Sequence, residues 1–198
     1  MLVRIAVNVT MTVQPFYLSL VTKFEASEEN PTPPPLALVP LLSYIMSMIF
    51  SIWIQRPMTR CLRSRIAPMF ISFLIITVTS VPLFFLNVDN RIWVYPLSTI
   101  QGVGIAIMLN NSTSLISDVI GTDSENSAFV YGCYSLFDKF ANGVLLYWII
   151  ATFSEDADAL KAIMATVPTI CSLLAFVSTY LGFKFYSHKL AKITGIRV

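Results

Sequence analysis

Six long apolar runs divide the 198-residue chain, and short polar segments separate them. A helix of about 20 residues rises about 30 Å, which is enough to cross the hydrocarbon core of a bilayer. Transmembrane strands would instead show short segments of alternating polarity, and the sequence has no such pattern. We therefore predict an all-α integral membrane protein with six spans and a tail at 187–198, the spans being at about residues 2–21, 36–54, 68–86, 96–120, 128–153 and 162–186.

Polar side chains are unevenly divided among these six predicted spans. In the third and sixth spans, the only polar residues are Ser, Thr and Tyr, apart from a lysine where the sixth helix ends. Surface that faces lipid must be apolar, so we expect spans one, four and five to line a polar interior, with three and six packed outside. The strongly polar residues of spans one, four and five are Arg4, Asn8, Gln14, Gln101, Asn110, Asn111, Asp118, Asp138, Lys139 and Asn142.

An acid and a base, Asp138 and Lys139, stand side by side in the middle of the fifth span. Consecutive residues of a helix point about 100° apart, so these two do not form a good ion pair with each other. Ser135 and Asn142 continue the same polar face, and the Asn142 amide is within reach of either charge. Lys139 then needs a carboxylate from another helix, a bound anion, or loss of its charge on burial. Alternatively, the pair lies near the cytoplasmic end of the span and snorkels to water.

Composition supports the membrane class, because 56% of the residues are hydrophobic and only 12% are charged, against about 25% charged in soluble domains. The basic residues lie beside the spans, which is typical of topology signals and not of a nucleic-acid surface. No metal site is expected, because the three cysteines are far apart and the one histidine lies in the tail. An intramembrane enzyme is disfavoured because the spans contain no histidine and no paired carboxylates.

The distribution of Lys and Arg predicts the orientation of the chain. One side of the membrane collects eight of them, in the loop after the second span and at the C-terminal end, whereas the other side has three. By the positive-inside rule, both termini are expected in the cytoplasm. Asp118 then lies at the cytoplasmic end of the fourth span, where a capping role or a contact with the basic loop is expected. Arg56 and Arg60 belong to that loop.

Four short motifs resemble a known family: SLISDVIG at 114–121, SAFVYG at 127–132, SLFDK at 135–139 and ANG at 141–143. Together with RPMTRCL at 56–62, they are similar to the lysosomal and melanosomal cysteine-transporter branch of the major facilitator superfamily. That branch is grouped with the glycoside-pentoside-hexuronide cation symporters. The resemblance implies that the chain corresponds to helices 7–12 of a twelve-helix transporter, and that Lys139 falls where a lysine lies near the cation site.

The resemblance also implies a function and partners. It favours secondary active, cation-coupled transport of a small polar solute, with cysteine as the best candidate and a carbohydrate as the alternative. H⁺ or Na⁺ is the expected coupling ion, and no other cofactor is expected. The expected membrane is lysosomal or melanosomal, alternatively the plasma membrane.

Alternating access requires two structural repeats, and six helices provide one. We therefore expect a missing N-terminal six-helix half or a second half-transporter as partner, besides the lipid bilayer and the solute. A non-transporting half that acts as a membrane interaction partner is the other alternative. The candidate pathway residues are Asp138, Lys139, Asn142, Ser135, Asn111, Gln101, Asn8 and Arg4, and the candidate gating or structural residues are Asp118, Arg56 and Arg60.

Overall fold

A computed structural model describes residues 1–22, 34–54, 57, 66–120 and 124–194. Within these ranges, the side chains of 54, 118–120, 124–127 and 186–194 are not described. The described chain is helical and contains no strand. Arg56 and Arg60 lie outside the described residues, and so does the side chain of Asp118. Their expected roles therefore stay predictions.

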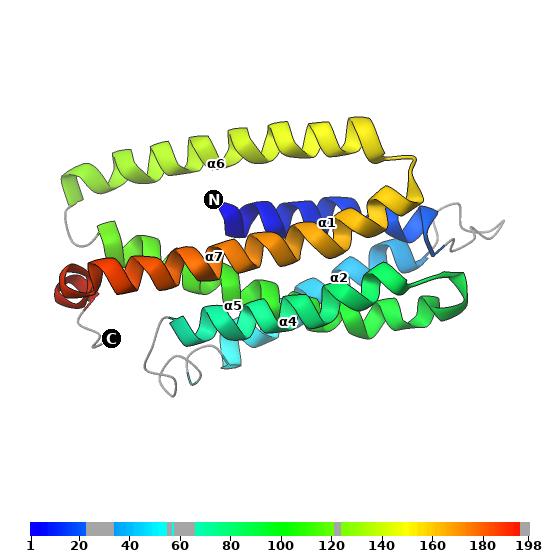
Figure 1. The fold of residues 1–198 in the computed structure, drawn as a ribbon, viewed down its shortest axis with the longest axis horizontal. Helices are drawn as coiled ribbons and strands as arrows, with labels where there is room; N and C mark the ends of the chain where they lie inside the picture. The colour runs from blue at the N-terminus through cyan, green and yellow to red at the C-terminus, as the bar shows by residue number, and fades with distance from the viewer. Residues whose placement is uncertain (23–33, 55–56, 58–65, 121–123, 195–198) are drawn as a thin grey trace.

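Six long helices run back and forth beside one another (Figure 1). A π-helical turn, Phe50–Ile54, follows the second helix, and a 3₁₀ turn, Val88–Trp93, precedes α5. The helices begin and end within a few residues of the expected spans, except that α7 starts earlier and ends later. They are α1 (Leu2–Leu20), α2 (Pro34–Ile49), α4 (Ile66–Phe85), α5 (Val94–Ile120), α6 (Ser124–Phe153) and α7 (Ala157–Thr194).

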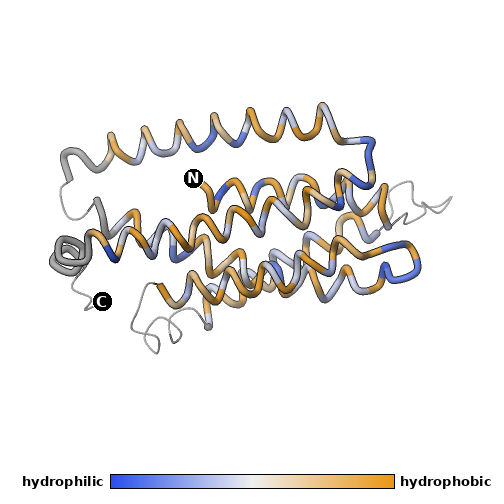
Figure 2. Tube along the Cα trace, in the orientation of Figure 1, coloured by the Kyte–Doolittle hydropathy of each residue, from blue (hydrophilic) through white to orange (hydrophobic). Residues whose placement is uncertain are grey.

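Five of the described helical segments are long and apolar enough to cross a membrane. They comprise Pro34–Trp53, Ile66–Phe85, Val88–Ser117, Ala128–Phe153 and Ala157–Phe185. The all-helical membrane fold is therefore confirmed. The more polar α1 is not among the five, so a count of six spans stays a prediction. Figure 2 shows the same division, with hydrophobic helices and hydrophilic turns between them.

The helix α5 makes most of its contacts with α2 and α4. Close approach depends on two glycines. A methyl group on Gly102 would come within 2.5 Å of the backbone oxygen of Ser43 in α2, and one on Gly104 would meet Ile75 and Ile76 of α4 at 2.9 to 3.0 Å. These small residues of α5 therefore allow close contact with α2 and with α4.

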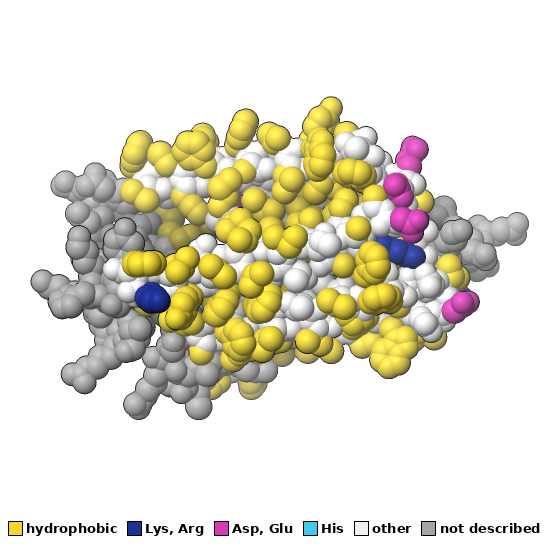
Figure 3. All heavy atoms as spheres, viewed as in Figure 1, with side chains coloured by type: hydrophobic (Ala, Val, Ile, Leu, Met, Phe, Trp, Pro, Cys, Tyr) yellow, Lys and Arg dark blue, Asp and Glu magenta, His cyan; other side chains and the backbone are white. Residues whose placement is uncertain are grey.

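The third and sixth helices, α4 and α7, pack against each other and present apolar side chains outward. Phe176 of α7 stacks beside Phe70 and Phe73 of α4, with ring centroids 5.4 and 6.3 Å apart. Figure 3 shows hydrophobic side chains along the helices on this face, and acidic ones gathered where α6 turns into α7. The exposed acidic residues of that turn are Glu155, Asp156 and Asp158.

The helix α6 makes few contacts with the rest of the bundle. It runs beside α1, apart from the other helices (Figure 1), and makes its remaining contacts with α7 near the turn that joins them. Only 17% of its candidate span is buried, whereas half of the α5 span is. The one flank that α6 does bury therefore faces α1.

Candidate functional site between α1 and α6

The flank of α6 that faces α1 is apolar toward its C-terminal end and polar near its middle. Leu145, Leu146 and Ile149 lie on it toward the C-terminal end and pack into the main hydrophobic cluster. One and two turns earlier, the same flank presents Asn142 and Asp138, which are 5% and 2% exposed. Because residues three and four apart share one face of a helix, a single flank carries both an apolar seam and a polar site.

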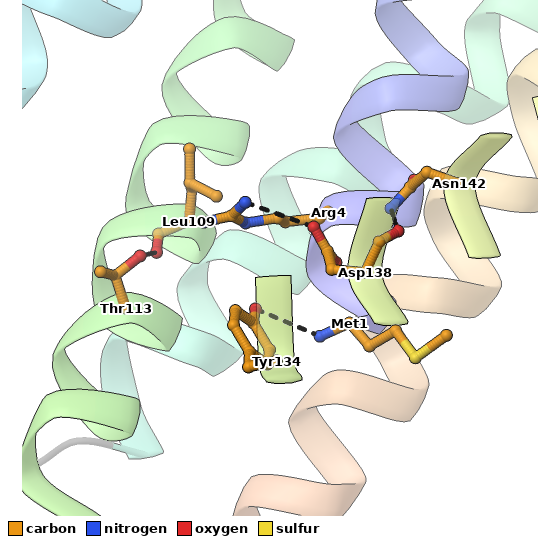
Figure 4. A network of polar contacts seen from close by, with 7 residues as sticks. All are labelled: Met1, Arg4, Leu109, Thr113, Tyr134, Asp138 and Asn142. Atoms are coloured by element: carbon orange, nitrogen blue, oxygen red, sulfur yellow. Dashed lines mark hydrogen bonds and ion pairs between the residues drawn. The ribbon is translucent and has the colours of Figure 1, made fainter. Parts of the chain in front are cut away.

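Arg4 of α1 pairs with Asp138, with Nη1 lying 3.2 Å from Oδ2 (Figure 4). The two partners differ in exposure, because 41% of the Arg4 side chain is accessible and only 3% of the Asp138 side chain. The Arg4 guanidinium also lies 5.6 Å from the centre of the Tyr134 ring, at cation–π distance. The Asp138 carboxyl group thus lies near the middle of α6 with a cation on one side.

Two buried oxygens at this site have no hydrogen-bond partner among the described residues: Asp138 Oδ1 and Asn142 Oδ1. The Asn142 amide is fixed by its other end, because Nδ2 donates to the backbone oxygen of Asp138 at 2.7 Å. Buried polar atoms are nearly always paired, so two unpaired acceptors one turn apart indicate that a donor belongs here.

Lys139 lies on the outer flank of α6 and is exposed. Its neighbours in the sequence, Phe137 and Phe140, are 63% and 70% exposed on that side. The separation of the two charges by helical geometry is therefore seen directly, since Asp138 turns inward and Lys139 outward. No ion pair of Lys139 occurs within the described part of the chain.

The polar residues of α5 lie mostly in helix contacts away from Asp138. Gln101 Nε2 donates to Ser80 of α4 at 3.2 Å, and Asn110 Nδ2 donates to Ser51 after α2 at 2.8 Å. Asn111 is also buried, at 4% exposure. The structure thus brings Arg4, Asp138 and Asn142 together and half-buries Ser135 on the same flank, whereas Gln101 lies between α5 and α4. Asn8 is half-buried on α1.

Sequence reasoning missed the Arg4–Asp138 pair, although both residues were on the candidate list. Asp138 was assigned no definite partner, and Asn142 was expected to reach a charged side chain. The available signal is that Arg4 is one of the strongly polar residues of α1. What the sequence does not show is that Arg4 faces α6.

A pocket of about 300 Å³ opens beside the site, at the end of the bundle where α1 begins. Tyr134 lines it together with Ser112 of α5 and Thr179 of α7, so the ring that contacts Arg4 is also a wall of this opening. Figure 4 shows the Arg4 guanidinium directed between α5 and α6, toward Asp138. The pocket thus lies next to the more exposed partner of the pair.

Comparison with curated proteins gives three relatives named major facilitator superfamily domain-containing protein 12. The human protein is 28% identical over 148 residues, the mouse protein 32% over 149 and the horse protein 29% over 145. The chain is homologous to part of a major facilitator superfamily protein. The matches cover 71 to 73% of the chain but only 27 to 28% of each relative.

The limited coverage fits one half of a major facilitator fold, as the motifs around Asp138 imply. No family model and no solved structure matches the chain. The homology supports a membrane transporter in general, and it favours a transporter over an enzyme. It also agrees with the apolar helices in placing the chain in a membrane.

Proposed function

We propose that the chain forms one half of a secondary active transporter that moves a small polar solute with the help of a cation gradient, and that the α1–α6 seam is part of the pathway. The observation that carries this proposal is the ion pair between Arg4 and Asp138, whose acid is buried midway along a membrane-spanning helix. Ionisable groups at that depth are costly and rare, and they mark solute and ion pathways. Transporter sites lie near the bilayer midplane.

The outer flank of α6 supports a second half as partner. Lys139 is exposed near the middle of Ala128–Phe153, where lipid would leave its charge unsolvated. A carboxylate from another six-helix unit, or a water-filled cavity between two units, would satisfy it. The chain spans only about 28% of the human and mouse relatives, which leaves ample length for such a unit.

For the solute, cysteine is the best candidate and a carbohydrate the alternative, both implied by the family resemblance. A lysosomal or melanosomal membrane is the proposed location, with the plasma membrane as alternative, and both termini are proposed to face the cytoplasm. The coupling ion is proposed to be H⁺ or Na⁺. A half that only binds other membrane proteins is the second candidate, and the uncovered flank of α6 is the feature that favours it.

The test replaces Lys139 with alanine in a chimera in which this chain takes the place of the stretch of the mouse relative that it matches. Uptake of labelled L-cysteine into vesicles should be lost, while the amount of inserted protein stays the same. Lys184→Ala is the matched control, because Lys184 is an exposed lysine of α7 away from this flank. Full uptake by the Lys139→Ala chimera would refute the role of Lys139. A parent chimera that inserts but does not transport would favour the binding role.

A further inference from the structure

The two unpartnered oxygens, Asp138 Oδ1 and Asn142 Oδ1, belong to residues one turn apart on one face of α6. Asp138 and Asn142 are four residues apart, and side chains of a helix lean toward its N-terminus, so Asn142 lies over the turn that carries Asp138. Figure 4 shows the Asn142 amide directed at the backbone oxygen of Asp138 and the Asp138 carboxylate directed at Arg4. Gln14 Oε1 is also buried without a partner, but it lies about 15 Å further along α1 than Arg4.

A single proton would satisfy both atoms. A protonated carboxyl group is a hydrogen-bond donor, whereas an ionised one only accepts. With the proton on Asp138 Oδ1, the carboxyl group can turn from Arg4 toward the next turn of α6, where its O–H donates to Asn142 Oδ1 and both acceptors are paired. We propose that Asp138 is the site of a coupled proton, that Asn142 is the acceptor that receives its hydrogen bond, and that Arg4 is released when the proton arrives.

The unequal burial of the ion pair makes this exchange possible. Asp138 is almost fully enclosed, so its ionised form depends on the Arg4 guanidinium. The Arg4 side chain is 41% accessible and lies beside Tyr134, which lines the pocket, so Arg4 is far less enclosed than its partner. The proton enters from water, the Nη1–Oδ2 ion pair is lost, and the freed guanidinium has one positive charge available for solvent or for an anionic group of the solute.

A metal cation fits this site less well than a proton. Arg4 already neutralises Asp138 at 3.2 Å, and a second cation would be repelled. Among the described residues, no three His, Cys, Asp or Glu side chains gather as possible ligands. The titratable groups that act on the carboxylate are Arg4 and the Met1 amino group on the α1 side and Tyr134 on α6, while Lys139 points away. The neighbouring α5 residues at the site, Leu109 and Thr113, are neutral.

This inference rests on the proposed function for its biological meaning, but it can be tested without transport. Infrared difference spectra of the whole chain in lipid nanodiscs, recorded on acidification, report protonated carboxyl groups directly. We expect a carboxyl C=O band that disappears in Asp138→Asn and moves in frequency in Asn142→Leu, which lacks the acceptor. In Arg4→Gln, the band should already be present at neutral pH, because the counter-ion is gone.

Controls and contrary results are as follows. Gln101→Leu removes an amide from α5 and should leave the band unchanged, and adding Na⁺ at fixed pH should do the same. A band that persists in Asp138→Asn, stays in place in Asn142→Leu, or is removed by Na⁺ would overturn the proton site. A chimera that does not transport L-cysteine, while the chain still shows the carboxyl band in its expected place, would overturn the proposed function. The proton site would then remain supported.

Discussion

Two helices of this bundle, α5 and α6, carry polar residues of similar kind in opposite settings. In α5, the amides of Gln101 and Asn110 donate to serine hydroxyls of neighbouring helices, which are neutral groups in close contact. In α6, Asp138 and Asn142 are equally buried but leave two acceptor atoms without a donor. Polar residues in a membrane helix can therefore serve packing or function, and their hydrogen-bond partners distinguish the two.

The two helices also differ in how closely they pack against their neighbours. A side chain on Gly102 of α5 would collide with the backbone of α2, whereas a methyl group on Gly143 of α6 would meet no atom within 4 Å. The helix α5 is therefore held in close contact at Gly102, and α6 has no such contact at Gly143.

The largest expected change in stability comes from disrupting the close contact between α5 and α2. Gly102→Ala should destabilise the chain by more than about 3 kcal/mol, because the methyl group meets backbone that cannot rotate away. Gly143→Ala is the matched control and should be neutral or stabilising by up to about 1 kcal/mol. Unfolding in mixed detergent micelles measures both. Equal losses in the two variants would mean that α5 and α6 are packed alike.

A somewhat smaller loss of stability should follow from removing Arg4, the counter-ion of Asp138 in α6. Arg4→Ala leaves the buried Asp138 carboxylate unpaired and should cost about 3 kcal/mol at neutral pH. The cost should shrink in acid, because protonation removes the stranded charge. Lys184→Ala, at an exposed position, should change the unfolding free energy by less than about 0.5 kcal/mol. A loss for Arg4→Ala that does not depend on pH would contradict the pairing.

The smallest effect is expected for the neutral pair between α5 and α4. A double-mutant cycle with Gln101→Leu and Ser80→Ala should give a coupling energy of about 0.6 kcal/mol, as for other hydrogen bonds between membrane helices. A coupling near zero would show that this hydrogen bond does not hold the two helices together. A coupling as large as the effect of Arg4→Ala would remove the contrast between the two regions.

Much of the fold follows from the sequence. The length of the apolar runs predicts the helices. The lack of strongly polar residues in α4 and α7 agrees with the outer position of these two helices, which pack against each other. Gly102 and Ala106 are small residues four apart, a spacing that favours a close helix crossing, and Gly102 does lie against the backbone of α2. These features depend on local composition and periodicity, which a single sequence contains. The number of spans stays a prediction, because α1 is not among the described helices that are long and apolar enough to cross a membrane.

The site was predicted only in part, for a physical reason. The fifth span stood out because Asp138 and Lys139 are charged, and helical geometry predicted that they diverge. The partner of Asp138 depends on how α1 is rotated against α6, and periodicity within one helix does not contain that rotation. The contrast between Gln101 and Asn142 was also hidden, because both are amides in apolar surroundings and only their neighbours distinguish them.

The central claim is that α6 carries the pathway and α5 the packing, and a matched pair of amide removals tests it most directly. In the chimera with the mouse relative, Asn142→Leu and Gln101→Leu each replace one buried amide with an apolar side chain of similar size. L-cysteine uptake per inserted molecule should fall at least about tenfold in Asn142→Leu, equivalent to about 1.4 kcal/mol, and remain near the parent level in Gln101→Leu. Unchanged uptake in Asn142→Leu together with loss in Gln101→Leu would contradict the claim.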